Sequence, residues 1–305
     1  MQNYRVFGIS RSSQVPACYR PYETDNEHFS FKSMGSNFEP AQLVELCEAE
    51  NIEYVLNFAA QSMVSQSWQK PSDWYQTNCV WLANLVTSFN SWGKVKKFIQ
   101  FSTPEVYGST PGWITESNHF NPSTPYAISR AAGDQHLLAM HKTMNFPVIL
   151  TRAANIYGPF QPRYRLIPKL ILNALTGEKL KLHGGGASQR SFIFEEDVGV
   201  AVLKVMRQGK VGETYHISTQ LALPIIEVVK KVTDLMQVPF KDVAEVVEEL
   251  PGKDSAYLLN SSKIRNELDW ADETSLEQGI SRTIKWAKDN LEQLLNQPSD
   301  YQHRS

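Results

Sequence analysis

Short apolar runs alternate with amphipathic segments along the first half of the chain. The runs are rich in β-branched and aromatic residues, which predicts buried strands, and they span residues 4–10, 54–58, 97–101 and 147–150. The segments between them place apolar residues at helical spacing, and they span residues 40–50, 74–89 and 127–144. Strands alternating with helices of this length predict an α/β fold with a parallel sheet covered on both faces.

The pattern changes after Tyr157. Glycine, proline and arginine cluster in residues 158–165, and shorter elements follow, with helices expected at 166–175, 224–236 and 275–294. We therefore predict a first domain over residues 1–157. A smaller α/β domain over residues 158–305, interleaved with the first, is expected to close over the carboxyl ends of the strands, where such sheets bind ligands.

Composition and charge remove several classes of protein. Of 305 residues, 42% are hydrophobic and 20% charged, which excludes a disordered or collagen-like chain. The net charge of −2 gives no reason to expect nucleic-acid binding. No apolar run reaches the roughly 18 residues that span a membrane. The three cysteines lack disulfide or zinc spacing, which favours a reducing cytoplasm, and His183 and His216 lack partners at metal-ligand spacing, so no metal site is expected.

The strongest local candidate for chemistry combines one strand end with one helix start. Thr103 and Glu105 directly follow a predicted strand, and Tyr126 opens a helix on which Arg130 lies one turn further on the same face. A cation there favours tyrosinate and lowers the pKa of Tyr126, so that the side chain can accept a hydroxyl proton beside a nicotinamide. The alternative is a tyrosine at a helix start with a solvated arginine.

Motifs in nearly the whole chain resemble the extended short-chain dehydrogenase/reductase family, in its NAD-dependent epimerase/dehydratase branch. The resemblance is nearest to nucleotide-sugar 4,6-dehydratases of the dTDP-glucose and GDP-mannose type. It rests on residues 56–68, 101–109, 121–134, 151–171, 184–198, 212–218 and 261–270. The resemblance implies a Rossmann-type doubly wound parallel sheet, NAD or NADP as cofactor and a nucleotide-diphosphate sugar as substrate.

The resemblance also implies roles for individual residues. Tyr126 matches the base for the sugar 4-hydroxyl, Thr103 the hydroxyl that positions it, and Glu105 the base that takes the C5 proton before water leaves from C6. Arg130 matches the lysine that pairs with the tyrosine and the cofactor ribose. The remaining matches fall into two groups, a cofactor set of Arg11, Ser12, Phe58, Ala59, Ala60, Asn78, Ser102, Tyr126 and Arg130, and a substrate set of Asn155, Arg165 and Arg190. Arg11 and Ser12 without an acidic neighbour favour a 2′-phosphate and hence NADP.

Four departures from the family pattern keep other functions open. Arginine stands in place of the catalytic lysine, Pro104 in place of an aspartate that protonates the leaving hydroxyl in dTDP-glucose enzymes, and Ser255 near the place of a phosphate-binding arginine. The first strand with its glycine-rich turn is not found, so the sequence either starts late or belongs to a shortened protein. A nucleotide-sugar epimerase and a catalytically silent binding subunit are the alternatives.

A homodimer is expected from two of the predicted helices. Residues 74–89 and 127–144 carry apolar side chains on more than one face, including Trp81, Leu85, Leu137 and Met140. In the resembling family the matching helices pair with their twins into a four-helix bundle, which would form a large apolar interface.

Overall fold

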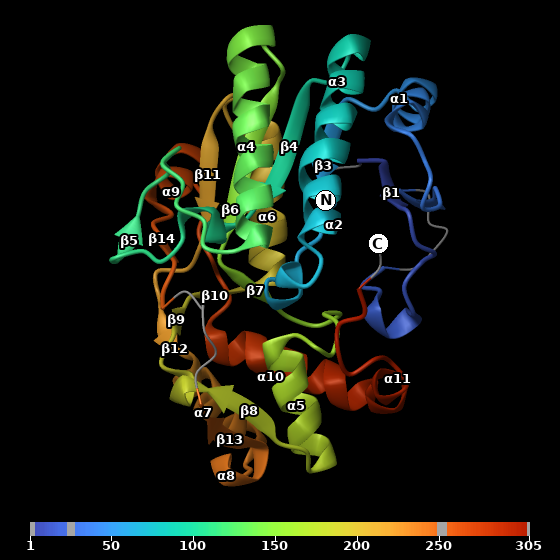
Figure 1. The fold of residues 1–305 in the computed structure, drawn as a ribbon. Coiled ribbons are helices and arrows are strands. Elements are labelled where there is room, and N and C mark those ends of the chain that lie inside the picture. The colour runs from blue at the N-terminus through green and yellow to red at the C-terminus, as the bar shows by residue number, and fades with distance from the viewer. Residues whose placement is uncertain (1–3, 23–27, 249–254, 304–305) are drawn as a thin grey trace.

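The computed structural model describes residues 4–22, 28–248 and 255–303, and its centre is a parallel sheet of four strands (Figure 1). The order across the sheet is β11 (Thr214–Ile217), β6 (Val148–Ala153), β4 (Lys97–Ser102) and β3 (Tyr54–Asn57). Three of these strands coincide with predicted ones. The α/β prediction is confirmed, and the carboxyl ends of β3, β4 and β6 meet at one edge of the sheet.

Helices cover both faces of this sheet. One face packs against α1 (Pro40–Ala49), α3 (Leu82–Trp92) and α4 (Pro125–Met144), and the other against α6 (Glu195–Gln208) and α9 (Ser262–Leu268). The two cores are separate. Phe98 and Leu150 point to the first set of helices, whereas Ile149 and Tyr215 point to the second, as alternation along a strand requires.

The predicted helix at 74–89 is part of a longer helical run with an irregular middle. It consists of α2 (Pro71–Tyr75), a π-helical turn η3 (Gln76–Trp81) and α3. Helix α4 packs closely on η3 because Gly133 faces it; a Cβ at Gly133 would lie 2.8 Å from the carbonyl oxygen of Asn78. This close approach requires a residue without a side chain where α4 meets η3.

The apolar residues expected at a dimer interface lie mostly inside one chain. Leu85, Leu137 and Met140 are buried between α3, α4 and the sheet, and Trp81 packs against the same core. Leu85, Leu137 and Met140 therefore cannot also form the apolar surface of a second contact, whereas Trp81 is only partly buried. That part of the expectation is corrected, because both helices use these side chains to cover their own sheet.

The first predicted strand does not join the central sheet. The strand β1 (Val6–Ser10) pairs in parallel with β2 (Phe29–Ser33), which the sequence pattern did not reveal, and the two form a separate sheet. Among the described residues no ladder joins β1 to β3. Apolar side chains at these strands, Val6 and Leu56, are accordingly exposed.

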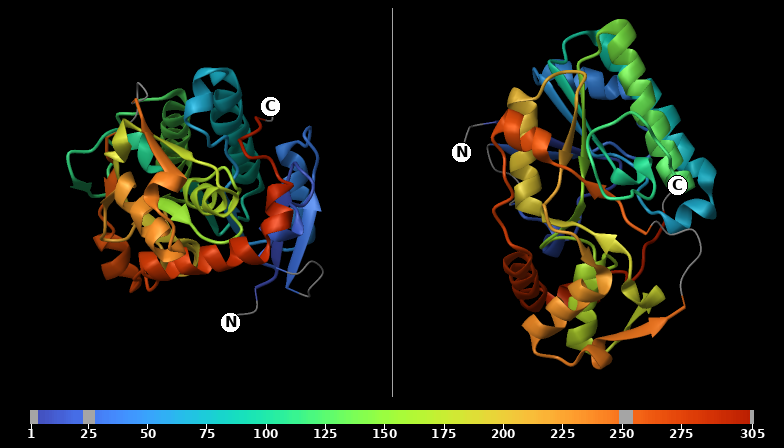
Figure 2. Two further views of the ribbon diagram at one scale, coloured as in Figure 1. Left: turned by 90° about the horizontal axis from the view of Figure 1, so that it is seen from below. Right: turned by 90° about the vertical axis from the view of Figure 1, so that its left-hand side faces the viewer.

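A second lobe lies below the carboxyl ends of the strands (Figures 1 and 2). Its core is formed by α5 (Leu166–Thr176), α7 (Ile225–Met236) and α10 (Leu276–Asp289). Its remaining elements are the parallel pair β8 (Leu180–His183) and β13 (Ala244–Val247), η5 (Gly184–Gly186), α8 (Phe240–Val243) and α11 (Leu291–Leu295). Strand β11 and helices α6 and α9 come from the second half of the chain but complete the upper lobe; the boundary after Tyr157 stays a prediction.

Short strand pairs and single turns carry three of the polar candidates, Glu105, Asn155 and Arg190. The strand pairs are β7 (Asn155–Tyr157) with β10 (Phe192–Phe194), β9 (Gln189–Arg190) with β12 (Leu223–Pro224), and β5 (Trp113–Ile114) with β14 (Leu258–Leu259). The single turns are η1 (Ala17–Tyr19), η2 (Ser65–Trp68) and η4 (Pro104–Tyr107). No helix in the described parts of the chain is long and apolar enough to cross a membrane.

A buried ion pair joins α4 to the sheet. Arg152 on β6 and Asp134 on α4 are 0% and 1% exposed, and Nη2 lies 2.8 Å from Oδ2. Ser102, the last residue of β4, donates its hydroxyl to the same carboxylate at 2.7 Å. The Asp134 carboxylate thus connects α4, which carries Tyr126, to the end of β4 and to β6.

Replacing Asp134 with alanine would leave the Arg152 guanidinium buried without its counter-ion. We expect the free energy of unfolding to fall by about 3–5 kcal/mol in urea denaturation. The control is Lys285→Ala, which breaks the exposed pair with Asp289 on α10 and should cost less than about 1 kcal/mol. Equal small losses in both variants would contradict a structural role for the buried pair.

Candidate active site

The end of β4 places Thr103 and Glu105 side by side. Thr103 has an extended backbone (φ −143°) and Pro104 begins η4, so the chain turns sharply just beyond the sheet. Thr103 is buried and donates its hydroxyl to the carboxylate of Glu105. Both side chains therefore stand at the carboxyl edge of the sheet, as predicted.

Tyr126 and Arg130 face this edge from α4. The helix begins where predicted, because the Thr124 hydroxyl accepts a hydrogen bond from the Ala127 amide at 3.2 Å and Pro125 occupies the first turn. Both side chains are buried, and Arg130 donates from Nη2 to the carbonyl of Phe101 on β4. Its Nε is buried without a hydrogen-bond partner in the described structure.

Burial dominates the electrostatics of Tyr126. Its pKa is raised to about 12, first by desolvation and then by the nearby Glu105 carboxylate. Arg130 acts in the opposite direction, with help from the Thr103 hydroxyl and from Arg165. The expectation that Arg130 brings this pKa toward neutrality is wrong for the ligand-free chain, because the desolvation cost exceeds the attraction of one cation.

Asn155 and Arg190 meet on the opposite wall, around a residue that the sequence analysis missed. Tyr257 donates its hydroxyl to Oδ1 of Asn155 at 3.2 Å, and the Arg190 guanidinium lies 4.1 Å from the centre of its ring. Burial raises the pKa of Tyr257, and the charge of Glu105 adds to the increase. Tyr257 thus contacts two of the three predicted substrate residues and lies close enough to Glu105 to feel its charge. It follows residues 249–254, which lie outside the described part.

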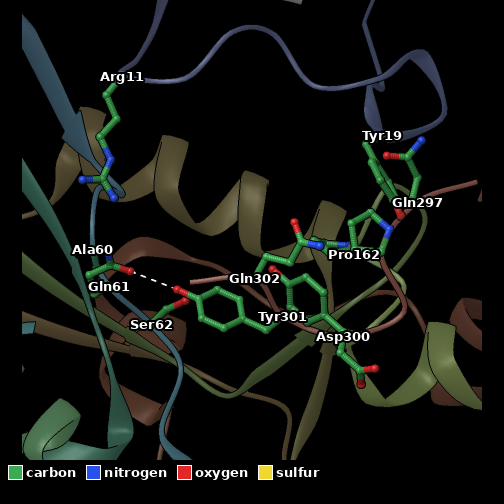
Figure 3. Close-up of a pocket in the computed structure, with 12 residues that line it drawn as sticks. Arg11, Tyr19, Ala60, Gln61, Ser62, Pro162, Gln297, Asp300, Tyr301 and Gln302 are labelled. Atoms are coloured by element: carbon green, nitrogen blue, oxygen red, sulfur yellow. Dashed lines mark hydrogen bonds between the residues drawn. The ribbon is translucent and has the colours of Figure 1, made fainter. Parts of the chain in front are cut away.

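Arg11 lies at a cavity of about 310 Å³ (Figure 3), and Arg165 contacts one of the residues that line it. Arg11 lines it directly, together with Ala60, Gln61 and Ser62 at the end of β3. The guanidinium of Arg165 lies 3.5 Å from the Ser62 hydroxyl. The predicted cofactor side and the predicted substrate side therefore adjoin at the tip of β3.

The other predicted cofactor residues divide by orientation. Phe58 is 57% exposed and lies 4.9 Å from the ring of Phe101, while the Ala59 amide donates to Asn57. The Asn78 side chain bonds the backbone of Gln61 from both its oxygen and its nitrogen. The Ser102 hydroxyl donates to Asp134. The backbone amide of Ser12 donates to the hydroxyl of Ser10, two residues earlier. Asn78 and Ser102 thus shape the site from behind.

Comparison with known protein families shows which family this chain belongs to. Residues 1–283 match the family model described as GDP-mannose 4,6 dehydratase. The chain belongs to this family. It is 35% identical over 277 residues to the dTDP-glucose 4,6-dehydratase of Haemophilus influenzae, with 82% of each chain covered.

The crystal structure of the dTDP-glucose 4,6-dehydratase of Streptomyces venezuelae, solved with NAD bound, has the same fold. It superposes with a TM-score of 0.85 at 29% identity, covering 96% of this chain and 90% of that one. A trifunctional UDP-glucose 4,6-dehydratase, epimerase and reductase of Arabidopsis thaliana is 32% identical over 268 residues, and the chain spans 40% of its length. The family match confirms the predicted membership of the 4,6-dehydratases. The structural match confirms the predicted Rossmann-type fold.

The Arg130–Tyr126 pair of this dehydratase-family site predicts a pH signature. In Arg130→Met, Tyr126 loses its nearest cation, so its pKa should rise further and turnover of a nucleotide sugar should fall most near neutral pH. The rate should partly recover as the pH rises. The measurement is a pH–rate profile, with Arg130→Lys as the charge-conserving control and Tyr126→Phe as the variant without a base. A constant ratio between wild type and Arg130→Met at every pH would contradict the electrostatic role.

Proposed function

We propose that this chain is an NAD-dependent nucleotide-sugar 4,6-dehydratase whose reaction takes place between the end of β4 and the start of α4. The observation that carries the proposal is the convergence of Thr103, Glu105 and Tyr126, with Arg130 one turn further along α4. Family membership supports the same reaction class. A base for a sugar hydroxyl and a base for a C–H bond lie within one buried space.

The residues present fit a nicotinamide dinucleotide at both of its ends. The buried Nε of Arg130 is a donor without a partner in the described structure, beside Tyr126, where ribose hydroxyls would satisfy it. At the other end Ala60 and Arg11 line the cavity, offering close approach and positive charge. The cofactor is NAD, as in two solved relatives, and not the NADP that Arg11 and Ser12 favour by sequence. When bound, it would supply the hydride acceptor for C4 and the donor for C6.

Tyr126 and Thr103 act on the sugar 4-hydroxyl. Thr103 holds the hydroxyl by hydrogen bonding, and Tyr126 in its ionised form takes the proton as C4 is oxidised to a ketone. Arg130 stabilises the tyrosinate and cannot itself exchange a proton, because guanidinium remains charged in proteins. Arg130 therefore contributes positive charge that stabilises the tyrosinate, and Tyr126 is the group that accepts the proton of the sugar 4-hydroxyl.

Glu105 acts on the 4-keto intermediate. The ketone makes the C5 proton acidic, and the Glu105 carboxylate accepts it. With Pro104 preceding Glu105, the same carboxyl group can return this proton to the C6 hydroxyl, which leaves as water. One residue then removes and delivers the proton, so the elimination balances without a second carboxyl group.

The substrate class is a nucleotide-diphosphate sugar. Asn155, Arg165 and Arg190 would bind the diphosphate and adjoining groups, with Tyr257 orienting the amide of Asn155. A panel of nucleotide sugars analysed by mass spectrometry separates the candidate functions. Dehydration removes one water from one nucleotide sugar, epimerisation leaves the mass unchanged while altering the sugar, and a silent binding subunit produces neither change.

Glu105→Gln should separate oxidation from elimination. The amide is nearly isosteric but cannot accept the C5 proton, so the water-loss product should form at least about 100-fold more slowly. Absorbance of reduced nicotinamide should build up in the same samples, because oxidation at C4 depends on Tyr126 instead. Dehydration at the wild-type rate would remove Glu105 from the mechanism.

We propose a homodimer formed by the outer face of η3 and α4. Val80 and Ile128, which are 46% and 42% exposed, lie on this helical pair and remain available to a second copy. Sedimentation at micromolar concentration should show a dimer, and Val80→Glu combined with Ile128→Glu should shift it to monomer. A monomeric wild-type protein would contradict the proposal.

We also propose that the protein works in the cytoplasm. Cys18, Cys47 and Cys79 are all free thiols, and burial raises the pKa of Cys47 to about 11. Thiols held in the protonated form are poorly reactive and suit a reducing compartment.

A further inference from the structure

The last described residues form a strap, here defined as Gln297–His303, that runs from the lower lobe to the upper one. At its lower end the Arg163 guanidinium donates to the carbonyls of Leu294, Leu295 and Gln297, at 3.2, 3.0 and 2.9 Å. These bonds satisfy carbonyl groups that the end of α11 leaves open. The chain therefore leaves α11 in a fixed direction, toward the cleft.

The upper end of the strap is attached to α2. His303 Nε2 lies 2.6 Å from Oδ2 of Asp73, and the imidazole stacks on the ring of Trp74 at 4.8 Å and 8°. Between the two ends, the Tyr301 hydroxyl donates to Oε1 of Gln61 at 3.1 Å. The C-terminal end accordingly lies beside α2 (Figure 1), and the strap crosses the tip of β3.

The strap forms one wall of the cavity at Arg11 and leaves the cavity open. The strap lines the space of about 310 Å³ with Gln297, Pro298, Asp300, Tyr301 and Gln302 (Figure 3). The Asp300 carboxylate is paired with Lys169, whose Nζ lies 3.2 Å from Oδ1. The opposite side consists of Arg11 and the tip of β3. A segment that merely filled a ligand site would leave no such volume between itself and the cationic wall.

Two guanidinium groups act on the Tyr301 hydroxyl. Burial raises the pKa of Tyr301, while Arg11 and Arg165 both act to lower it. Arg11 belongs to the predicted cofactor side and Arg165 to the predicted substrate side. Tyr301 and Arg11 line the same cavity, so a phenol O–H donor and a guanidinium are both available there to a phosphate oxygen.

We propose that this cavity binds the diphosphate group of a nucleotide ligand, that the Tyr301 hydroxyl exchanges its hydrogen bond to Gln61 for one to a phosphate oxygen, and that the strap retains the ligand by walling the cavity. The proposal rests on the proposed function, which supplies two ligands with a diphosphate, the dinucleotide and the nucleotide sugar. A dinucleotide regenerated within each turnover has no need to leave, so a wall against its release is compatible with catalysis.

The test compares three variants of the full chain with wild type. Tyr301→Phe removes the hydroxyl and keeps the ring against Tyr164, a stop codon after Pro298 removes most of the strap, and Tyr54→Phe at the far end of β3 is the matched control. Stopped-flow fluorescence measures the release of NADH. Calorimetry with dTDP measures binding of a nucleoside diphosphate that lacks the sugar.

In Tyr301→Phe we expect NADH to be released about tenfold faster, or dTDP to bind about tenfold more weakly, or both. About tenfold is the scale of one hydrogen bond to a charged group. The truncated chain should lose at least as much, and Tyr54→Phe should match wild type. The ligand that responds identifies which diphosphate the cavity holds. Unchanged or tighter binding of both ligands after truncation and in Tyr301→Phe would overturn the proposal.

The nucleotide-sugar panel distinguishes this failure from failure of the proposed function. If wild type produces no water-loss product but truncation still speeds the release of NADH or weakens dTDP, the strap proposal stands and dehydration does not. If dehydration proceeds but neither NADH release nor dTDP binding changes in the strap variants, only the strap proposal fails. A wild-type chain that binds neither ligand overturns both.

Discussion

The buried pair between Arg152 and Asp134 is the interaction on which the geometry of the site depends. A guanidinium excluded from water needs a carboxylate and further hydrogen bonds, and Arg152 obtains them from Asp134 and the Tyr107 hydroxyl at 2.5 Å. Tyr107 in turn lies 2.9 Å from Nε2 of His216, whose pKa is lowered to about 3 by burial and by the charge of Arg152. The imidazole stays neutral, so the network carries one positive and one negative charge.

The sequence predicts best those features that local physics determines. Apolar runs located β3, β4 and β6, and helical spacing with a Thr-Pro start located α4, because burial of a strand and capping of a helix leave marks within a few residues. Since parallel strands end at a common edge, the convergence of Thr103 and Glu105 with Tyr126 could also be inferred. Strand β2, with its exposed alternate residues, carried too weak a pattern.

Features that depend on distant parts of the chain could not be predicted in this way. Tyr257 and Tyr301 reach the cleft from segments with no periodicity, and although Ser255 stands near the place of a phosphate-binding arginine, no pattern singles out either tyrosine. Conversely, Asn78 and Ser102 have polar side chains at promising positions but turn them inward, to the backbone of Gln61 and to Asp134. The polarity of a residue does not by itself predict whether its side chain faces the cleft or the protein interior.

The exclusion of water from the site raises the pKa of Tyr126 and also strengthens the interactions between charges there. Removing solvent costs the tyrosinate its hydration, and the Glu105 carboxylate opposes a second negative charge nearby. The same low-polarity surroundings strengthen every favourable charge, so Arg130, Arg165 and any further cation brought into the cleft act on Tyr126 more strongly than they would in water. In the proposed mechanism, Tyr126 keeps its proton in these surroundings and acts as a base only when further positive charge joins Arg130 and Arg165 in the cleft.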